Sequence, residues 1–139
     1  MSEADAVAGR IVSHMFANDR AAHSLGIEVV EVRAGYASVA FSVSEDMLNA
    51  YGSAHGGYLF ALADTAFAYA CNSGGETCVA LACSISFASP GRAGSRLTAS
   101  ARERNLGGRT GIYDVEIVDE FGTAIAFFRG TSYRITRVG

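Results

Sequence analysis

The chain has 139 residues, of which 50% are hydrophobic and 18% are charged, and its formal net charge at pH 7 is −3. This length suits one domain with a substantial core, and the composition excludes a disordered chain. The slight negative charge gives no electrostatic reason to expect a nucleic acid or an anionic membrane as partner.

The N-terminus and the cysteines indicate a cytoplasmic protein. Residues 1–10 carry acids before the first arginine and lack the hydrophobic stretch of a signal peptide. No apolar run is long enough to span a membrane. The three cysteines Cys71, Cys78 and Cys83 are an odd number without a C-x-x-C motif. We expect buried free thiols, and neither a disulfide framework nor a metal site.

Residues 3–20 predict an amphipathic helix, because Val7, Ile11 and Met15 recur about one turn apart. We expect this helix to end near the Asn-Asp pair at 18–19. It belongs to an N-terminal helical segment.

A β-hairpin is predicted next. Residues 27–33 and 36–43 are rich in valine and alternate imperfectly, and Ala-Gly at 34–35 supplies the turn between them. Residues 44–53 are predicted to form a loop.

A nearly apolar helix is predicted at 57–72, with Gly-Gly at 74–75 as its stop. Asp64 is the only formal charge between residues 47 and 75. Burying a lone carboxylate costs several kcal/mol unless it is compensated. Catalysis is the first explanation to consider.

Four strands are predicted after this helix, at 77–87, 96–104, 109–119 and 123–135. The first is a nearly continuous apolar run, as expected of a strand covered on both faces. The short separators before the last two strands suit hairpins.

The element order is therefore helix, two strands, apolar helix and four strands. Only an antiparallel sheet wrapped around the apolar helix can bury it. The pattern predicts a single α+β domain over residues 1–139, with residues 1–25 as the N-terminal helical segment and 57–72 as the central helix.

Gly56 and Gly57 stand where the central helix begins. The N–H groups of a first helical turn are unpaired and carry the positive end of the helix dipole. They suit a carbonyl oxygen that develops negative charge. The alternative is that both glycines only allow a tight turn into the helix.

Gly57 and Asp64 share a helix face but lie about 10 Å apart along the axis. One chain therefore does not bring Asp64 to the helix N-terminus. Two antiparallel copies of the helix would do so, which predicts a symmetric homodimer with two sites at the interface. The alternative is a structural Asp64 that is bonded to backbone or to a hydroxyl such as that of Thr65.

The spacing of Asn49, the His-Gly-Gly at 55–57 and Asp64 resembles the signature of hotdog-fold acyl-CoA thioesterases, specifically the PaaI-type phenylacetyl-CoA thioesterases. The segments MFANDRAAHSLGI, MLNAYGSAHGGYLFALADTAFAYACNSGG, GIYDVEIV and FRGTSYRI are similar to that subgroup, so the resemblance covers nearly the whole chain.

This resemblance implies the hotdog fold, dimers paired into homotetramers, and hydrolysis of arylacetyl-CoA in phenylacetate degradation. CoA is then part of the substrate, and no separate cofactor is implied. Asp64 is the implied general base or nucleophile, and the Gly56 N–H polarises the thioester carbonyl. Asn49 orients the carboxylate or water, and His55 supports the oxyanion loop. Asn18 has a supporting role near the acyl pocket, and Gly57 is a substrate-binding residue.

Three arginines are candidates for the phosphates of CoA: Arg92, Arg109 and Arg129. The alternative for each is an ordinary solvated surface charge. Relatives typically read L-R-P where this chain has Ala-Ser-Pro at 88–90, and Arg92 stands two residues past that proline.

Two other functions remain open from the sequence. A hotdog hydratase or dehydratase generally needs a histidine acting together with an acid, and the central helix has no histidine after position 55. A non-catalytic acyl-CoA-binding module is the other alternative.

Overall fold

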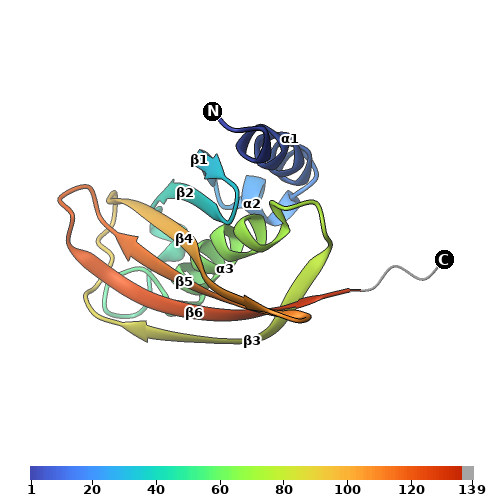
Figure 1. Cartoon of the computed structure of the whole chain (residues 1–139). Coiled ribbons are helices and arrows are strands. Elements are labelled where there is room, and N and C mark those ends of the chain that lie inside the picture. Colours follow the sequence, from blue (N-terminus) through green and yellow to red (C-terminus); the bar gives the residue numbers. More distant parts are fainter. Residues whose placement is uncertain (136–139) are drawn as a thin grey trace.

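The computed structural model describes residues 1–135. One six-stranded antiparallel sheet curves around a long helix (Figure 1). The elements are α1 (Glu3–Ala17), α2 (Arg20–Ser24), β1 (Glu28–Arg33), β2 (Tyr36–Ser42), the 3-10 turn η1 (Glu45–Met47), α3 (Gly56–Asn72), β3 (Cys78–Phe87), β4 (Arg96–Gly107), β5 (Thr110–Val118) and β6 (Ala124–Arg134). The predicted α+β class and element order are confirmed.

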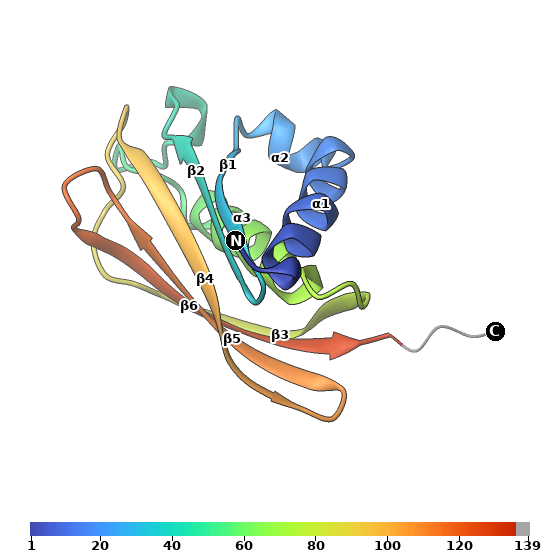
Figure 2. The same ribbon diagram turned by 45° about the horizontal axis from the view of Figure 1, so that its top comes forward.

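The sheet has the strand order β1-β2-β4-β5-β6-β3, with antiparallel neighbours throughout. The chain leaves β2, forms α3 across the concave face, and returns as β3 at the far edge beside β6. Helices α1 and α2 lie on the same side of the sheet as α3, and α1 packs against β1 and α3 (Figure 2).

The core lies between α3 and the concave face of the sheet. Leu62 and Phe67 of α3 are buried against strand residues such as Phe41 and Ile117. The Phe67 ring approaches the sheet so closely that a Cβ on Gly130 would lie 2.8 Å from it. Glycine at this position therefore lets α3 settle onto β6.

Helix α1 ends at the predicted Asn-Asp pair, and a second short helix that was not predicted, α2, begins with Asp19 as its N-cap. Two other predicted boundaries were wrong. Strand β4 continues to residue 107 past an irregularity between Glu103 and Asn105, so the turn is Gly108-Arg109. The φ of +59° at Gly108 suits the first position of a two-residue hairpin turn. Helix α3 begins at Gly56, one residue before the predicted start.

Strand β3 is not covered on both faces in the single chain. It forms an edge of the sheet, and Val79, Leu81 and Phe87 are exposed. Apolar side chains on an unpaired edge mark a surface that another chain can cover.

The cysteines are free thiols as predicted, although only Cys71 is buried, and Cys78 and Cys83 are partly buried. No cluster of metal-ligating side chains occurs within residues 1–135. Among the helices that the structure describes, none has the length and apolar character needed to span a membrane.

Candidate active site

Asn49 anchors the loop that leads into α3. Its Oδ1 atom accepts hydrogen bonds from the N–H groups of Tyr51 (2.9 Å) and Ser53 (3.2 Å), and its own N–H donates to the Ser53 carbonyl (2.8 Å). Among the described residues, its side-chain amide nitrogen has no acceptor. Asn49 therefore shapes the loop with its oxygen and keeps a donor available.

His55 is the N-cap of α3. Its Nδ1 accepts a hydrogen bond from the Gly57 N–H at 3.0 Å, and its backbone N–H donates to the Met47 carbonyl at 2.7 Å. An accepting Nδ1 requires a ring whose proton is on Nε2. The histidine thus stabilises the start of the helix instead of meeting a carboxylate.

The Gly56 N–H is the open donor at this terminus, since no described residue accepts a hydrogen bond from it. The Phe87 ring covers one side of Gly56, where a Cβ would lie 2.9 Å from the ring Cζ. Gly56, Phe87 and Asn49 line one cavity together with Leu59 and residues 88–91.

Asp64 is partly buried on α3, and no residue in the described part of the chain pairs with it or hydrogen-bonds to it. Burial raises the pKa of this carboxyl above its usual range, and the negative charge of Asp19 adds to the effect. The hydroxyl of Thr65 donates to the Ala61 carbonyl at 2.7 Å. It is therefore not the partner of Asp64 that the structural alternative required.

One chain does not join Asp64 to the open donor. Gly56 and Asp64 lie more than two turns apart on the same helix, which is about 12 Å along its axis. The structure thus agrees with the predicted separation between Asp64 and the start of the central helix.

Asn18 and Asp19 occupy the junction of α1 and α2. The Asn18 side-chain amide donates to the His14 carbonyl at 3.0 Å, and the residue is exposed. Asp19 accepts from the Ala22 N–H (3.0 Å) and from the hydroxyl of the buried Tyr69 (2.8 Å).

Asp19 was missed as a candidate residue. Its position before a short polar helix could have predicted the cap, but not the contact with Tyr69, which is fifty residues away in the sequence. Through this contact the junction of α1 and α2 is tied to the helix that carries Asp64.

The three candidate arginines lie at different places. Arg92 follows the cavity loop, is paired through its backbone with Ser53, and has no acid within ion-pair distance among the described residues. Arg109 lies in the β4–β5 turn, next to a second cavity at the C-terminal end of α3. A single chain therefore does not gather them around one ligand.

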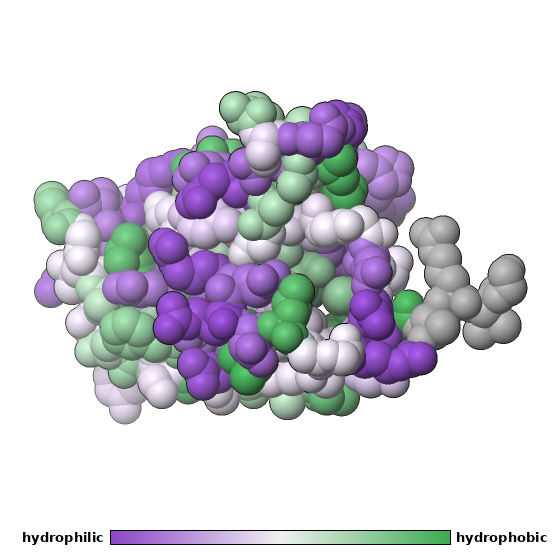
Figure 3. Space-filling view, in the orientation of Figure 1, coloured by the Kyte–Doolittle hydropathy of each residue, from purple (hydrophilic) through white to green (hydrophobic). Residues whose placement is uncertain are grey.

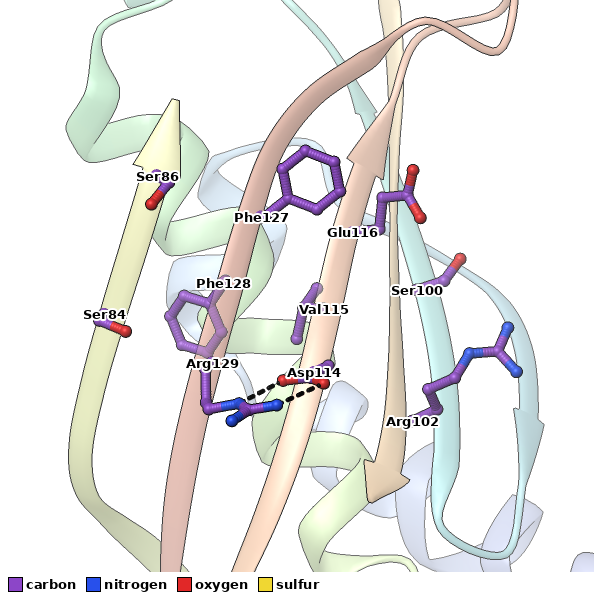
Figure 4. Close-up of a pocket in the computed structure, with 10 residues that line it drawn as sticks. All are labelled: Ser84, Ser86, Ser100, Arg102, Asp114, Val115, Glu116, Phe127, Phe128 and Arg129. Atoms are coloured by element: carbon purple, nitrogen blue, oxygen red, sulfur yellow. Dashed lines mark hydrogen bonds and ion pairs between the residues drawn. The ribbon is translucent and has the colours of Figure 1, made fainter. Parts of the chain in front are cut away.

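Arg129 lies on the outer face of the sheet. Its guanidinium makes two hydrogen bonds to Asp114, at 2.6 and 2.9 Å, and this partner holds the pKa of the Asp114 carboxyl below its usual range (Figure 4). Hydrophilic side chains gather over the middle of β4–β6 on this face (Figure 3). Arg129 is thus already engaged within its own chain.

The chain is similar in sequence to known proteins. The thioesterase superfamily matches residues 51–126. The acyl-coenzyme A thioesterase PaaI of Escherichia coli K12 is 52% identical over 121 residues, which cover 87% of this chain and 86% of that protein. A putative esterase of Archaeoglobus fulgidus is 38% identical over 126 residues, 91% of this chain and 82% of that protein.

Solved structures give the same result. The structure of E. coli PaaI, from the phenylacetic acid degradation operon, has a TM-score of 0.93 at 48% identity and covers 95% of this chain and 96% of its own. A hypothetical thioesterase of Streptococcus pneumoniae TIGR4, solved with coenzyme A, has a TM-score of 0.76 at 30% identity, covering 81% of this chain and 91% of its own.

Proposed function

The chain belongs to the thioesterase superfamily, and we propose that it hydrolyses acyl-CoA thioesters, with phenylacetyl-CoA and its ring-hydroxylated forms as preferred substrates. The observation that carries this proposal is Asp64, a partly buried carboxylate that no described residue pairs with or hydrogen-bonds. The acyl preference follows from the similarity to the E. coli PaaI protein of the phenylacetic acid degradation operon.

In the proposed reaction the Gly56 N–H donates a hydrogen bond to the thioester carbonyl oxygen, with support from the positive end of the α3 dipole. Asp64 then either removes a proton from water as the water oxygen adds to the carbonyl carbon, or attacks that carbon itself and forms an anhydride that water hydrolyses. The C–S bond breaks, and the CoA thiolate leaves and takes up a proton.

Asn49 and His55 have supporting roles in this proposal. The free amide donor of Asn49 orients the attacking carboxylate or water. His55 engages the Gly57 N–H, which leaves the neighbouring Gly56 N–H for the substrate. Gly57 thus contributes to the site through the shape of the turn.

The catalytic unit in this proposal is a homodimer, which assembles further into a homotetramer. Antiparallel α3 helices would place Asp64 of one chain beside Gly56 of the other. The exposed apolar edge strand β3 supports such pairing, because a second copy can extend the sheet there.

Arg92 is the proposed partner for a CoA phosphate, because it is exposed, adjoins the cavity loop and lacks an acidic partner within residues 1–135. Arg109 and Arg129 remain weaker candidates, since one lies at the opposite end of α3 and the other is engaged by Asp114. Asn18 remains a proposed supporting residue near the acyl group.

An acyl-CoA panel with a thiol-reactive dye tests the function. Wild type and an Asp46→Asn control, which changes an exposed acid, should release thiol, whereas Asp64→Asn should lose at least about 100-fold in kcat. Stable binding without thiol release would favour an acyl-CoA-binding module. Conversion of 2-enoyl-CoA to 3-hydroxyacyl-CoA would favour a hydratase.

A further inference from the structure

We propose that Phe87 is a positioning residue of the thioester site: its ring keeps water from one side of the Gly56 N–H and contacts the sulfur end of the substrate, so that the carbonyl oxygen stays at that donor. This inference rests on the proposed function. The inference extends the proposed function, because it assigns a role to a side chain outside the motif of Asn49, His55-Gly56-Gly57 and Asp64.

The contact between Phe87 and Gly56 is close. Ring atoms Cζ, Cε1 and Cε2 would lie 2.9, 3.3 and 3.5 Å from a Cβ at position 56. Only a residue without a side chain allows the ring to cover this part of the helix terminus. The N–H that lacks an acceptor therefore lies beside an apolar wall.

The backbone of Phe87 is held firmly. Phe87 is opposite Ala126 in the sheet, and the next two N–H groups, of Ala88 and Ser89, both donate to the Ile125 carbonyl, at 2.8 and 3.2 Å. In the single chain Phe87 is nevertheless 55% exposed. Because it lines the same cavity as Gly56, part of this apolar surface can contact a ligand there.

The residues that line the cavity indicate which part of a substrate meets the ring. Phe87, Pro90 and Gly91 line the same cavity as Gly56, and Arg92 is the next residue in the chain. A thioester with its oxygen at Gly56 and its phosphates at Arg92 would pass Phe87 with the sulfur and the first methylene groups of its pantetheine arm. Sulfur and methylene groups both make favourable contacts with an aromatic ring.

The chemical consequence concerns the strength of the donor. A hydrogen bond to a developing oxyanion is worth more where water is excluded. Phe87 excludes water from one side of Gly56, so its removal should weaken transition-state stabilisation more than ground-state binding.

The test compares Phe87→Ala, Phe87→Leu and Phe127→Ala with wild type. Phe127 is the matched control, because it is 48% exposed and lies opposite Ser86 on the outer face of the same sheet region (Figure 4). For phenylacetyl-CoA and hexanoyl-CoA, kcat and KM are measured together with the elution volume in size-exclusion chromatography.

Phe87→Ala should lower kcat by about 10- to 100-fold, by the same factor for both substrates, with KM changed less than about threefold. Phe87→Leu keeps an apolar cover and should retain at least about a third of kcat. Phe127→Ala should match wild type.

Three results would overturn the inference: unchanged kcat in Phe87→Ala, a loss confined to one acyl group, or a shift of the variant to a monomer. The second would place the ring in the acyl pocket, and the third would assign it to assembly. A wild-type protein that releases no thiol from any acyl-CoA would instead refute the proposed function.

Discussion

The Nδ1 atom of His55 accepts the hydrogen bond of the Gly57 N–H at 3.0 Å, and this bond assigns two adjacent N–H groups to different tasks. The Gly57 donor is satisfied within the chain, whereas no described residue accepts from Gly56. Because His55 accepts from Gly57, the Gly56 N–H is the donor of the first helical turn that a ligand can use.

Two substitutions of His55 test its role as the N-cap of α3. His55→Ala removes the N-cap of α3 and should reduce the free energy of unfolding by about 1 kcal/mol, whereas His55→Asn supplies another good cap and should remain near wild type. Urea denaturation measures both. Equal stabilities for the two variants would contradict a capping role.

Gly56→Ala should lower activity without unfolding the protein. The new methyl group would meet the far end of the Phe87 side chain, which is half exposed and can rotate away. Alanine is also a better helix former than glycine. We expect an unchanged or slightly higher midpoint in thermal denaturation and a loss of about tenfold or more in kcat. A large fall in stability would show that the ring is fixed.

The sequence predicted the central helix and its lone acid, because both depend on local pattern. It placed Asp64 far from the Gly56-Gly57 turn, and the structure agrees since helix geometry fixes that distance. The contact of Asp19 with Tyr69 was not predictable, because it depends on how α1 and α2 dock on α3. The length of β4 depended on a strand irregularity that leaves no local signal.

The charge of Asp64 should destabilise the fold at neutral pH. The raised pKa means that the folded state holds the Asp64 proton more tightly than the unfolded chain. Protonated Asp64 therefore contributes to the free energy of unfolding below the pKa that the carboxyl has in the unfolded chain. This contribution is lost as the pH rises through the higher pKa of the folded state. Asp64→Asn should therefore be more stable than wild type near pH 7, by up to about 1 kcal/mol because solvent screens a partly exposed carboxylate.

At about pH 3 the difference in stability between Asp64→Asn and wild type should disappear, because the Asp64 carboxyl is then protonated in both the folded and the unfolded chain. Guanidinium unfolding at the two pH values measures it. If Asp64→Asn were more stable than wild type by the same amount at both pH values, the gain would come from packing and not from the removed charge.

Asp19 should contribute to the pH dependence of the reaction. Burial is the main cause of the raised pKa of Asp64, and the negative charge of Asp19 adds to it, so Asp19→Asn should shift the acidic limb of the kcat profile toward lower pH. Asparagine still caps α2 and still accepts from the Tyr69 hydroxyl. Asp46→Asn, at an exposed site, is the control and should leave the limb in place. An unshifted limb in Asp19→Asn would contradict the coupling.

A mixed-dimer experiment tests whether each site takes groups from two chains. Gly56→Pro removes the open N–H. Proline suits the backbone of this first helical position because His55 has an extended backbone with ψ of 136°, and the proline ring displaces the Phe87 side chain as any side chain here would. Asp64→Asn removes the carboxylate. Each variant alone should be inactive if the site needs both groups.

Co-expressed with different affinity tags, the two variants should recover about a quarter of wild-type activity per chain. Random pairing makes half of the dimers mixed, and each mixed dimer has one site with both an intact Gly56 and an intact Asp64. In a homotetramer, tandem purification removes only assemblies that contain one kind of chain, so the activity should rise to a little under about a third of wild type. Mixed dimers that are isolated but inactive would show that Gly56 and Asp64 of the same chain serve one substrate. The two-turn separation along α3 argues against that outcome.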